Sequence, residues 1–233
     1  TFNLLEATRF YFQKLSRSNK SSFRFLHVST DEVYGSLGPE GLFNEESAYN
    51  PRSPYASSKA ASDHFVQAFF HTYDLPILIT NCSNNYGPWQ FPEKLIPVII
   101  SRAISQQDIP IYGDGLNIRD WIYVDDHIEA LLLVLKKGIL GNSYCIGANE
   151  EHQNIEIAQM ICDLLDQIQP CEISYSSLIR SVKDRAGHDK RYAIDSTKIR
   201  KNLGWFPENN FSVALKKTVN WYLSNQDWCK KLS

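Results

Sequence analysis

Two short stretches of the sequence carry side chains that could do chemistry together. The first, STDEVYG (residues 29–35), places two carboxylic acids side by side where an apolar run over residues 23–29 ends. The second places Tyr55 and Lys59 four residues apart, so both lie on one face of a helix. A tyrosine base and two acids could move protons to and from the hydroxyl groups and carbons of a sugar.

Tyr55 could act as a base only if its phenolate were stabilised. A free tyrosine, with a pKa of about 10, is roughly 0.1% ionised at pH 7. The Lys59 ammonium one turn away, partly shielded from water and helped by a positively charged cofactor, would supply the roughly 4 kcal/mol needed to bring this pKa near 7. The alternative is an exposed helix turn in which the two residues have no chemical role.

Composition excludes several classes of protein. The 233 residues are 43% hydrophobic, enough to build the core of one or two domains. A net charge of −2 gives no basic field for nucleic acid, and the longest apolar runs fall short of the ~20 residues that a membrane span needs. The five cysteines are widely spaced without CxxC, which favours reduced thiols and a cytoplasmic location, and no histidine spacing indicates a metal site.

Hydrophobic periodicity predicts alternating helices and strands. Helices are expected over residues 1–15, 54–73, 91–106, 125–137, 154–168, 196–203 and 212–224. Strands are expected over residues 23–29, 76–81, 109–112, 118–124 and 142–147. This alternation is typical of an α/β fold with a doubly wound parallel sheet. Since neighbouring strand residues point to opposite faces, Asp31 and Glu32 can address one ligand only if the first strand ends by Thr30.

The motifs resemble those of one enzyme family over nearly the whole chain. They are STDEVYG, SPYASSKAASDH, TNCSNNYGP, FPEKLIP, PIYGDG, IRDWIYVDDH, YCIG, DRAGHDKRYAID and LGW. Together they resemble the extended short-chain dehydrogenase/reductase superfamily, and within it the nucleotide-sugar 4,6-dehydratases that act on dTDP-glucose. Related epimerases carry no acid pair like Asp31-Glu32 beside their Ser or Thr.

The resemblance implies a Rossmann-like sheet with a smaller interleaved substrate-binding domain. Residues 1–88 and 118–138 would form the NAD-binding domain, and residues 89–117 and 139–233 the sugar-nucleotide domain. It also implies NAD as cofactor and a dTDP-hexose substrate. Homodimerisation would follow through helices 1–15 and 54–73.

Catalytic roles follow from the same resemblance. Tyr55 would take the O4 proton while Thr30 holds O4 and Lys59 tunes Tyr55. Glu32 would then remove the C5 proton, and a protonated Asp31 would give its proton to the departing C6 hydroxyl. The implied cofactor-binding residues are Tyr55, Lys59 and Asn85. The implied substrate-binding residues are Thr30, Asn84, Lys94, Leu95, Pro110, Ile111, Tyr112, Arg119, Asn154, Asp184, Arg185, Ala186, Gly187 and His188.

Several of these positions have a plain structural alternative. Lys94 could be a solvated side chain, the asparagine cluster over residues 81–88 a capped turn, and residues 184–188 an ordinary loop. An arginine among apolar neighbours, as at Arg119, needs either an anionic ligand or an internal ion pair with a nearby aspartate. The family carries proline where this chain has Ala186, so the loop is expected to be less restrained.

The start of the chain gives a further expectation. The sequence opens inside a helical pattern, its only methionine is Met160, and it contains no G-x-G-x-x-G loop. We therefore expect the family's first strands and pyrophosphate loop to be absent, and this chain alone to bind NAD weakly. Two rival readings stay open: a UDP-sugar epimerase or decarboxylase, which needs only Thr30, Tyr55 and Lys59, and a non-catalytic protein that keeps the fold as a scaffold.

Overall fold

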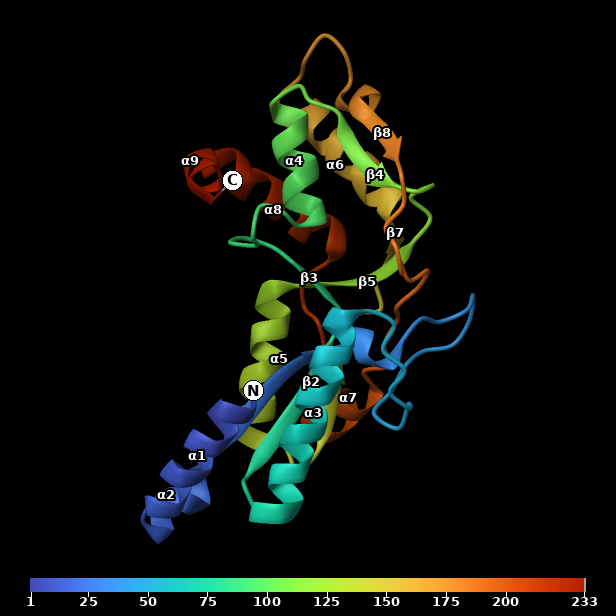
Figure 1. The fold of residues 1–233 in the computed structure, drawn as a ribbon. Helices are drawn as coiled ribbons and strands as arrows, with labels where there is room; N and C mark the ends of the chain where they lie inside the picture. Colours follow the sequence, from blue (N-terminus) through green and yellow to red (C-terminus); the bar gives the residue numbers. More distant parts are fainter. Residues whose placement is uncertain (233) are drawn as a thin grey trace.

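The computed structural model describes residues 1–232, which form two lobes joined by short strands (Figure 1). The lower lobe is built on a parallel sheet in the order β1-β2-β6. Its strands are β1 (Phe25–Thr30), β2 (Ile77–Cys82) and β6 (Ser143–Ile146). The register pairs Thr30 with Cys82, so the carboxyl ends of β1 and β2 lie side by side. Ligands bind at this edge of open α/β sheets.

Helices cover both faces of this sheet. On one face, Ile77 and Ile79 pack with α1 (Phe2–Lys14) and α3 (Pro54–Tyr73). On the other face, Leu78 packs with helices α5 (Val124–Lys137) and α7 (Thr197–Leu203). Because successive strand residues point to opposite faces, this alternation divides the core into two layers. The predicted Rossmann-like, doubly wound fold is confirmed.

The upper lobe holds two smaller sheets. The first has the order β3-β5-β7, with β3 and β5 parallel and β5 and β7 antiparallel; the second is the parallel pair β4-β8. Their bounds are Asn84–Tyr86 for β3, Ile118–Tyr123 for β5, Glu151–Gln153 for β7, Ile109–Tyr112 for β4 and Ile179–Val182 for β8. Strands β3 and β5 lie between the two lobes (Figure 1).

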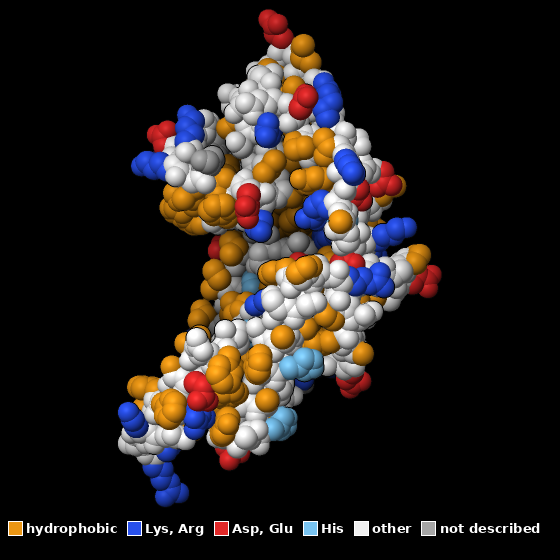
Figure 2. All heavy atoms as spheres, viewed as in Figure 1, with side chains coloured by type: hydrophobic (Ala, Val, Ile, Leu, Met, Phe, Trp, Pro, Cys, Tyr) orange, Lys and Arg blue, Asp and Glu red, His pale blue; other side chains and the backbone are white. Residues whose placement is uncertain are grey.

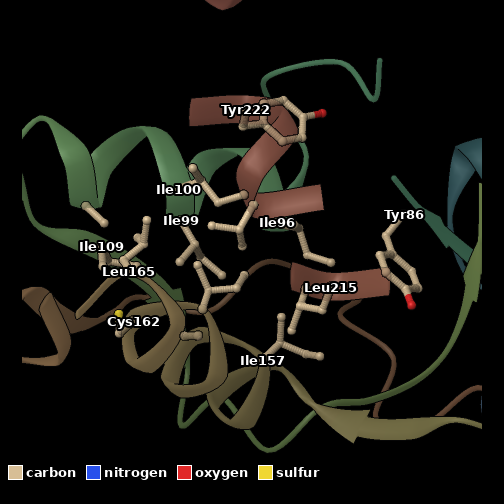
Figure 3. Packing of buried hydrophobic residues seen from close by; sticks show 14 of the residues in the cluster. Tyr86, Ile96, Ile99, Ile100, Ile109, Ile157, Cys162, Leu165, Leu215 and Tyr222 are labelled. Atoms are coloured by element: carbon tan, nitrogen blue, oxygen red, sulfur yellow. The ribbon is translucent and has the colours of Figure 1, made fainter. Parts of the chain in front are cut away.

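Three helices form the apolar core of the upper lobe. They are α4 (Leu95–Ile104), α6 (Asn154–Ile168) and α8 (Phe211–Ser224). The labelled side chains that meet in Figure 3 are Tyr86, Ile96, Ile99, Ile100, Ile109, Ile157, Cys162, Leu165, Leu215 and Tyr222. Nearly all of them are apolar and buried, so this lobe has a core of its own.

Strand β6 crosses the predicted domain boundary. Residues 139–233 were assigned to the sugar-nucleotide domain, yet Ser143–Ile146 pairs with β2 in the lower sheet. The helix α7 that follows later in the chain also packs on that sheet. The division into two interleaved domains stays a prediction, and these two elements return the chain to the lower lobe.

Local signals explain where several elements begin. A short helix, α2 (Arg17–Ser22), was not predicted; it begins where the Ser16 side chain accepts a hydrogen bond from the Asn19 amide at 3.3 Å. Helix α4 begins at Leu95 rather than Phe91, which leaves Pro97 in the first turn where its missing N–H costs nothing. A last helix, α9 (Gln226–Leu232), was not predicted.

Charged side chains are spread over both lobes, and the surface is hollowed where the lobes meet (Figure 2). Within residues 1–232, no helix is long and apolar enough to cross a bilayer.

Candidate active site

The acid pair sits in a tight turn at the end of β1. The strand stops at Thr30, as predicted, and a 3₁₀ turn, η1 (Asp31–Tyr34), follows it. Thr30 caps this turn, because its Oγ1 accepts from the Glu32 amide at 3.3 Å. The turn ends the alternation of strand side chains, so neither acid has to point to the face opposite the other.

Asp31 is buried with an incomplete set of hydrogen bonds. It is 2% exposed, its Oδ1 accepts from Thr30 Oγ1 at 3.2 Å, and its Oδ2 has no partner among the described residues. Burial, followed by the neighbouring Glu32 and Asp120 carboxylates, raises the pKa of Asp31 to about 8, against the opposing effects of Thr30 and Arg119. This carboxyl group therefore holds its proton at pH 7 and can serve as an acid.

Glu32 differs from its neighbour in its surroundings. It is only half-buried, and although burial raises its pKa, the positive charges of Arg119, Arg185 and Lys94 oppose that rise. The two adjacent acids thus stand in unlike environments, which is the arrangement expected for a pair with opposite proton-transfer roles.

Tyr55 and Lys59 stand in the first turns of α3. Ser53 caps this helix by accepting from the Ala56 amide at 3.0 Å, with Pro54 at its first position. The Tyr55 side chain is 55% exposed, and its electrostatic neighbours are Glu32, Cys82 and Asp31. The tyrosine therefore faces the strand ends that carry the acid pair.

The pKa of Tyr55 depends on its burial and on the nearby acid pair. Burial and the surrounding carboxyl groups raise the pKa of Tyr55 above its ordinary value. The Lys59 ammonium instead donates to the main-chain carbonyl of Val28 at 2.8 Å. A pKa of Tyr55 lowered by Lys59 together with a positively charged cofactor stays a prediction, since in this structure the Val28 carbonyl holds the ammonium and two acids face the phenol.

The asparagine cluster after β2 forms strand β3 rather than a capped turn. Asn85 Nδ2 donates to Cys82 Sγ at 3.4 Å and to the Ser83 carbonyl at 3.1 Å, and its Oδ1 lies 2.7 Å from His127 Nδ1. Burial lowers the pKa of His127 to about 4, so this imidazole is neutral and its Nδ1–H donates to Asn85. Asn84 pairs with Trp121 of β5 and stays half-buried.

Arg119 is a buried cation without a carboxylate partner. It is 6% exposed, and its guanidinium donates to the carbonyls of Ile118, Asp189 and Lys190 at 2.7, 2.9 and 3.4 Å. It also lies over the Tyr192 ring, 4.5 Å from the ring centroid. Within residues 1–232 it forms no salt bridge, so the internal ion pair is not present and the charge is available to an anionic ligand.

The loop over residues 184–188 carries further cationic side chains. In the loop over residues 184–188, Asp184 Oδ1 accepts from the Arg185 amide at 2.8 Å and lies 2.6 Å from His188 Nδ1. The Arg185 guanidinium lies 5.5 Å from the centroid of the Tyr112 ring. Gly187 adopts a positive φ of 67°, which a side chain at this position would strain, and Ala186 beside it is exposed.

The remaining predicted substrate residues fall into two groups. Lys94 and Pro110 are at least partly exposed, and Lys94 precedes the first residue of α4. The Ile111 side chain is buried in the upper core, so only its backbone could contact a ligand, whereas Leu95 packs against this core and stays half-buried. Asn154 is the first residue of α6, whose start is fixed by a capping box formed by Gln153 and Glu156.

The geometry brings most of the predicted site together and adds residues that the sequence analysis missed. Asp120, fully buried, has one carboxylate oxygen without a hydrogen-bond partner within residues 1–232 and a pKa raised to about 6, chiefly by burial. The signal in the sequence that could have identified Asp120 is its position directly after Arg119. His127, within a motif interpreted as structural, orients Asn85. Asp63, four residues after Lys59 on the same helix, is also buried and multiply hydrogen-bonded.

Comparison with known proteins identifies the family. A family model described as GDP-mannose 4,6 dehydratase matches residues 1–218. The chain is 55% identical over 230 residues to the dTDP-glucose 4,6-dehydratase of Xanthomonas campestris pv. campestris (strain ATCC 33913) and 53% identical over 237 residues to dTDP-glucose 4,6-dehydratase 1 of Escherichia coli (strain K12). In both alignments 98% of this chain covers 66% of the relative, so the chain spans about two thirds of their length.

Solved structures give the same result. The dTDP-glucose 4,6-dehydratase of Bacillus anthracis, in complex with NAD, matches with a TM-score of 0.87 and 44% identity, covering 99% of this chain and 68% of that one. The Streptomyces venezuelae enzyme with NAD and TYD bound matches with a TM-score of 0.88 and 41% identity, covering 98% and 68%. A UDP-glucuronic acid 4-epimerase from Bacillus cereus is 26% identical, with a TM-score of 0.80 and coverage of 95% and 65%. The chain belongs to the GDP-mannose 4,6 dehydratase family, and its close relatives there are dTDP-glucose 4,6-dehydratases.

Proposed function

We propose that the full-length protein is an NAD-dependent hydro-lyase that converts dTDP-glucose to its 4-keto-6-deoxy product. The observation that carries the proposal is the acid pair at the end of β1, with Asp31 buried and protonated beside a half-buried Glu32 and within the electrostatic reach of Tyr55. Identity of more than 50% to several curated dTDP-glucose 4,6-dehydratases supports this substrate over a UDP-sugar.

The donors at the strand ends suit the nicotinamide end of NAD. The Lys59 ammonium has three N–H donors, of which the Val28 carbonyl takes one, and Tyr55 presents a half-exposed hydroxyl. Asn85 lies in β3, the short strand that follows the carboxyl end of β2 and runs between the two lobes. Bound NAD would accept a hydride from C4 of the sugar and return it to C6. Lys59 and Tyr55 would hold its ribose, and Asn85 would lie against the nicotinamide.

In the oxidation half, Tyr55 removes the proton of the C4 hydroxyl while Thr30 holds O4 by a hydrogen bond. The raised pKa of Tyr55 means that the phenol is the resting form. Tyr55 must therefore pass its proton on before it can serve as the base. Lys59, on the same face of α3, is placed to favour the ionised form once its charge is no longer shared with the Val28 carbonyl.

In the elimination half, the C4 ketone acidifies C5, and Glu32 removes the C5 proton. Asp31 gives its proton to the leaving C6 hydroxyl, so that water departs. The environments of the two acids support this division, since one is fully buried and the other faces three cations. An epimerase needs no acid pair of this kind.

The nucleotide diphosphate would bind the cations between the lobes. Arg119 and Arg185 both act on Glu32 electrostatically, as does Lys94, so the three charges gather around the acid pair. His188 and the backbone of residues 184–188 would contact the same phosphates, together with Asn84, Asn154 and the β4 segment over residues 110–112. Burial of Arg119 without a counter-ion makes it the main anchor.

Turnover of dTDP-glucose and UDP-glucose by the full-length protein tests this proposal. We expect loss of water from dTDP-glucose, with the product detected by the absorbance of its 4-ketone, and much weaker activity on UDP-glucose. Interconversion of C4 epimers without loss of water would favour the epimerase reading. Absence of any turnover, with or without NAD, would favour the scaffold reading.

We also propose a cytoplasmic homodimer. The sequence has five widely spaced cysteines and no CxxC motif, which suits a reducing compartment. Helices α1 and α3 expose neighbouring aromatic side chains, including Phe2, Tyr11, Phe65 and Tyr73, which a second subunit could cover. Sedimentation of the full-length protein as a monomer at micromolar concentration would count against the dimer.

A further inference from the structure

Asp63 lies at the centre of a buried polar network that joins the segments carrying the proposed chemistry. It is 1% exposed on α3, two turns after Tyr55. Its Oδ2 accepts from Ser29 Oγ at 2.8 Å, Tyr49 Oη at 2.9 Å and Asn81 Nδ2 at 3.1 Å. Its Oδ1 lies 3.0 Å from His27 Nε2. One carboxylate thus accepts from four side chains.

The donors come from three separate segments. His27 and Ser29 belong to β1, Asn81 to β2, and Tyr49 to the return limb of the long loop before α3. Ser29 directly precedes Thr30, and Asn81 Nδ2 also donates to the Thr30 carbonyl at 3.2 Å. A displacement of Asp63 would therefore be transmitted to Thr30 through two routes.

The same helix reaches β1 a second time, one turn earlier. Lys59 Nζ donates to the Val28 carbonyl, and Asp63 accepts from the next residue of that strand, Ser29. Two bonds at successive residues of β1 fix both the position and the rotation of α3 against the strand. Tyr55 is rigidly attached to this helix, so its distance from Thr30 is set by these bonds.

We propose that Asp63 is a positioning residue that sets the placement of Tyr55 relative to Thr30. This inference rests on the proposed function, because it assigns Asp63 to the oxidation half of that reaction and not to elimination. Asp31 and Glu32 lie in η1 and share no hydrogen bond with Asp63 within residues 1–232; the bonds of Asp63 reach the main chain of Thr30, whereas η1 is capped by the Thr30 side chain. A carboxylate, which has only acceptors, suits four donors, whereas an amide would turn an N–H toward at least one of them.

The test compares Asp63→Asn with two milder variants in the full-length protein. Ser29→Ala removes only the bond from β1. Ser174→Ala is the matched control, because it removes a serine-to-aspartate bond of the same kind, 2.5 Å from Ser174 Oγ to Asp166 Oδ2, outside the elements that hold the site. Reduced nicotinamide formed in a single turnover reports oxidation, and loss of water from the pre-formed 4-ketone reports elimination.

We expect Asp63→Asn to slow oxidation by on the order of 10²-fold, since a misplacement of about 1 Å costs that much, with KM and elimination nearly unchanged. Ser29→Ala should show the same selective loss to a smaller degree, and Ser174→Ala none. Equal slowing of both halves by Ser29→Ala, or no slowing of oxidation, would overturn the proposal. If Asp63→Asn does not fold, Ser29→Ala alone decides.

Hydrogen exchange separates this inference from the proposed function. In Ser29→Ala, amides at residues 29–30 and 53–57 should exchange faster together, while Ser174→Ala leaves both segments unchanged. If Ser29→Ala shows this coupled exchange but the wild-type protein does not turn over dTDP-glucose, the proposed function is refuted and the positional coupling is not. Unchanged exchange in both segments of Ser29→Ala would refute the coupling whatever the activity.

Discussion

Two buried aspartates, Asp31 directly after β1 and Asp63 in the middle of α3, differ in how their carboxyl groups are hydrogen-bonded. Asp63 accepts four hydrogen bonds, whereas Asp31, almost as deeply buried, accepts one and leaves Oδ2 without a partner among the described residues. Buried polar groups in proteins are nearly always satisfied, and exceptions concentrate where chemistry occurs. Asp63 therefore holds α3 in place against β1, whereas the carboxyl group of Asp31 is left free to exchange a proton.

The largest expected effect comes from removing the proton chemistry at the unsatisfied site. Asp31→Asn combined with Glu32→Gln should lower the rate of elimination by about 10⁴-fold, the upper range for loss of positioned acid–base groups, while oxidation at C4 continues. Mixing this variant with substrate should then accumulate reduced nicotinamide without forming the 6-deoxy product. Parallel loss of both steps would mean that the acids only support the strand end.

Tyr55→Phe should affect the other half of the reaction. We expect oxidation to slow by about 10²- to 10⁴-fold, because the proton of the C4 hydroxyl loses its acceptor. Formation of reduced nicotinamide measures this step. The complementary control is the pre-formed 4-ketone, from which the variant should eliminate water at close to the wild-type rate; a large loss there would assign Tyr55 to both halves.

Asp63, which accepts four hydrogen bonds, should affect the stability of the fold. Asp63→Asn removes an acceptor from several buried donors and should lower the free energy of unfolding by about 2–4 kcal/mol. Urea denaturation of the full-length protein measures the change. Asp166→Asn, whose carboxylate accepts from Ser174 Oγ and the Tyr175 amide at a more exposed place, should cost less. Equal losses would remove the distinction drawn for Asp63.

Asp31 should instead make the folded protein less stable as the pH rises. Between about pH 4 and pH 8 the folded protein keeps the proton on Asp31 that the unfolded chain loses, so stability falls as pH rises through this range. Asp31→Asn cannot ionise and should be more stable than wild type by about 5 kcal/mol at pH 8, roughly 1.4 kcal/mol for each pH unit above 4, with the difference vanishing near pH 4. A wild-type protein whose stability relative to Asp31→Asn rises with pH would contradict the assignment.

Sequence patterns predicted the elements that position the site. Helix α3 and strand β4 begin and end where expected, since Ser53 and Pro54 mark the start of the helix and apolar periodicity its length. Strand β1 ends at Thr30 as the chemistry of an adjacent acid pair requires. Short strands such as β7 were missed because tertiary pairing with β5 creates them, and three residues carry no periodicity.

The electrostatics of the site could be predicted only in part. Adjacent acids with opposite roles required unlike pKa values, which matches the burial of Asp31 beside the more open Glu32. The bond from Lys59 to Val28 and the four donors of Asp63 depend on how α3 lies against β1. No spacing within the helix shows that register, so the sequence could predict neither the bond from Lys59 to Val28 nor the raised pKa of Tyr55.

The protonation state of Asp31 tests the account most directly. Titration of its carboxyl carbon by ¹³C NMR in the full-length protein, with the signal assigned by its absence in Asp31→Asn, gives the pKa without any assumption about turnover. We predict a titration centred at about pH 8, so that the group is an acid at neutral pH. A titration near pH 4, the range of an ordinary aspartate, would show an ionised carboxylate that cannot protonate the leaving hydroxyl, and would contradict the mechanism.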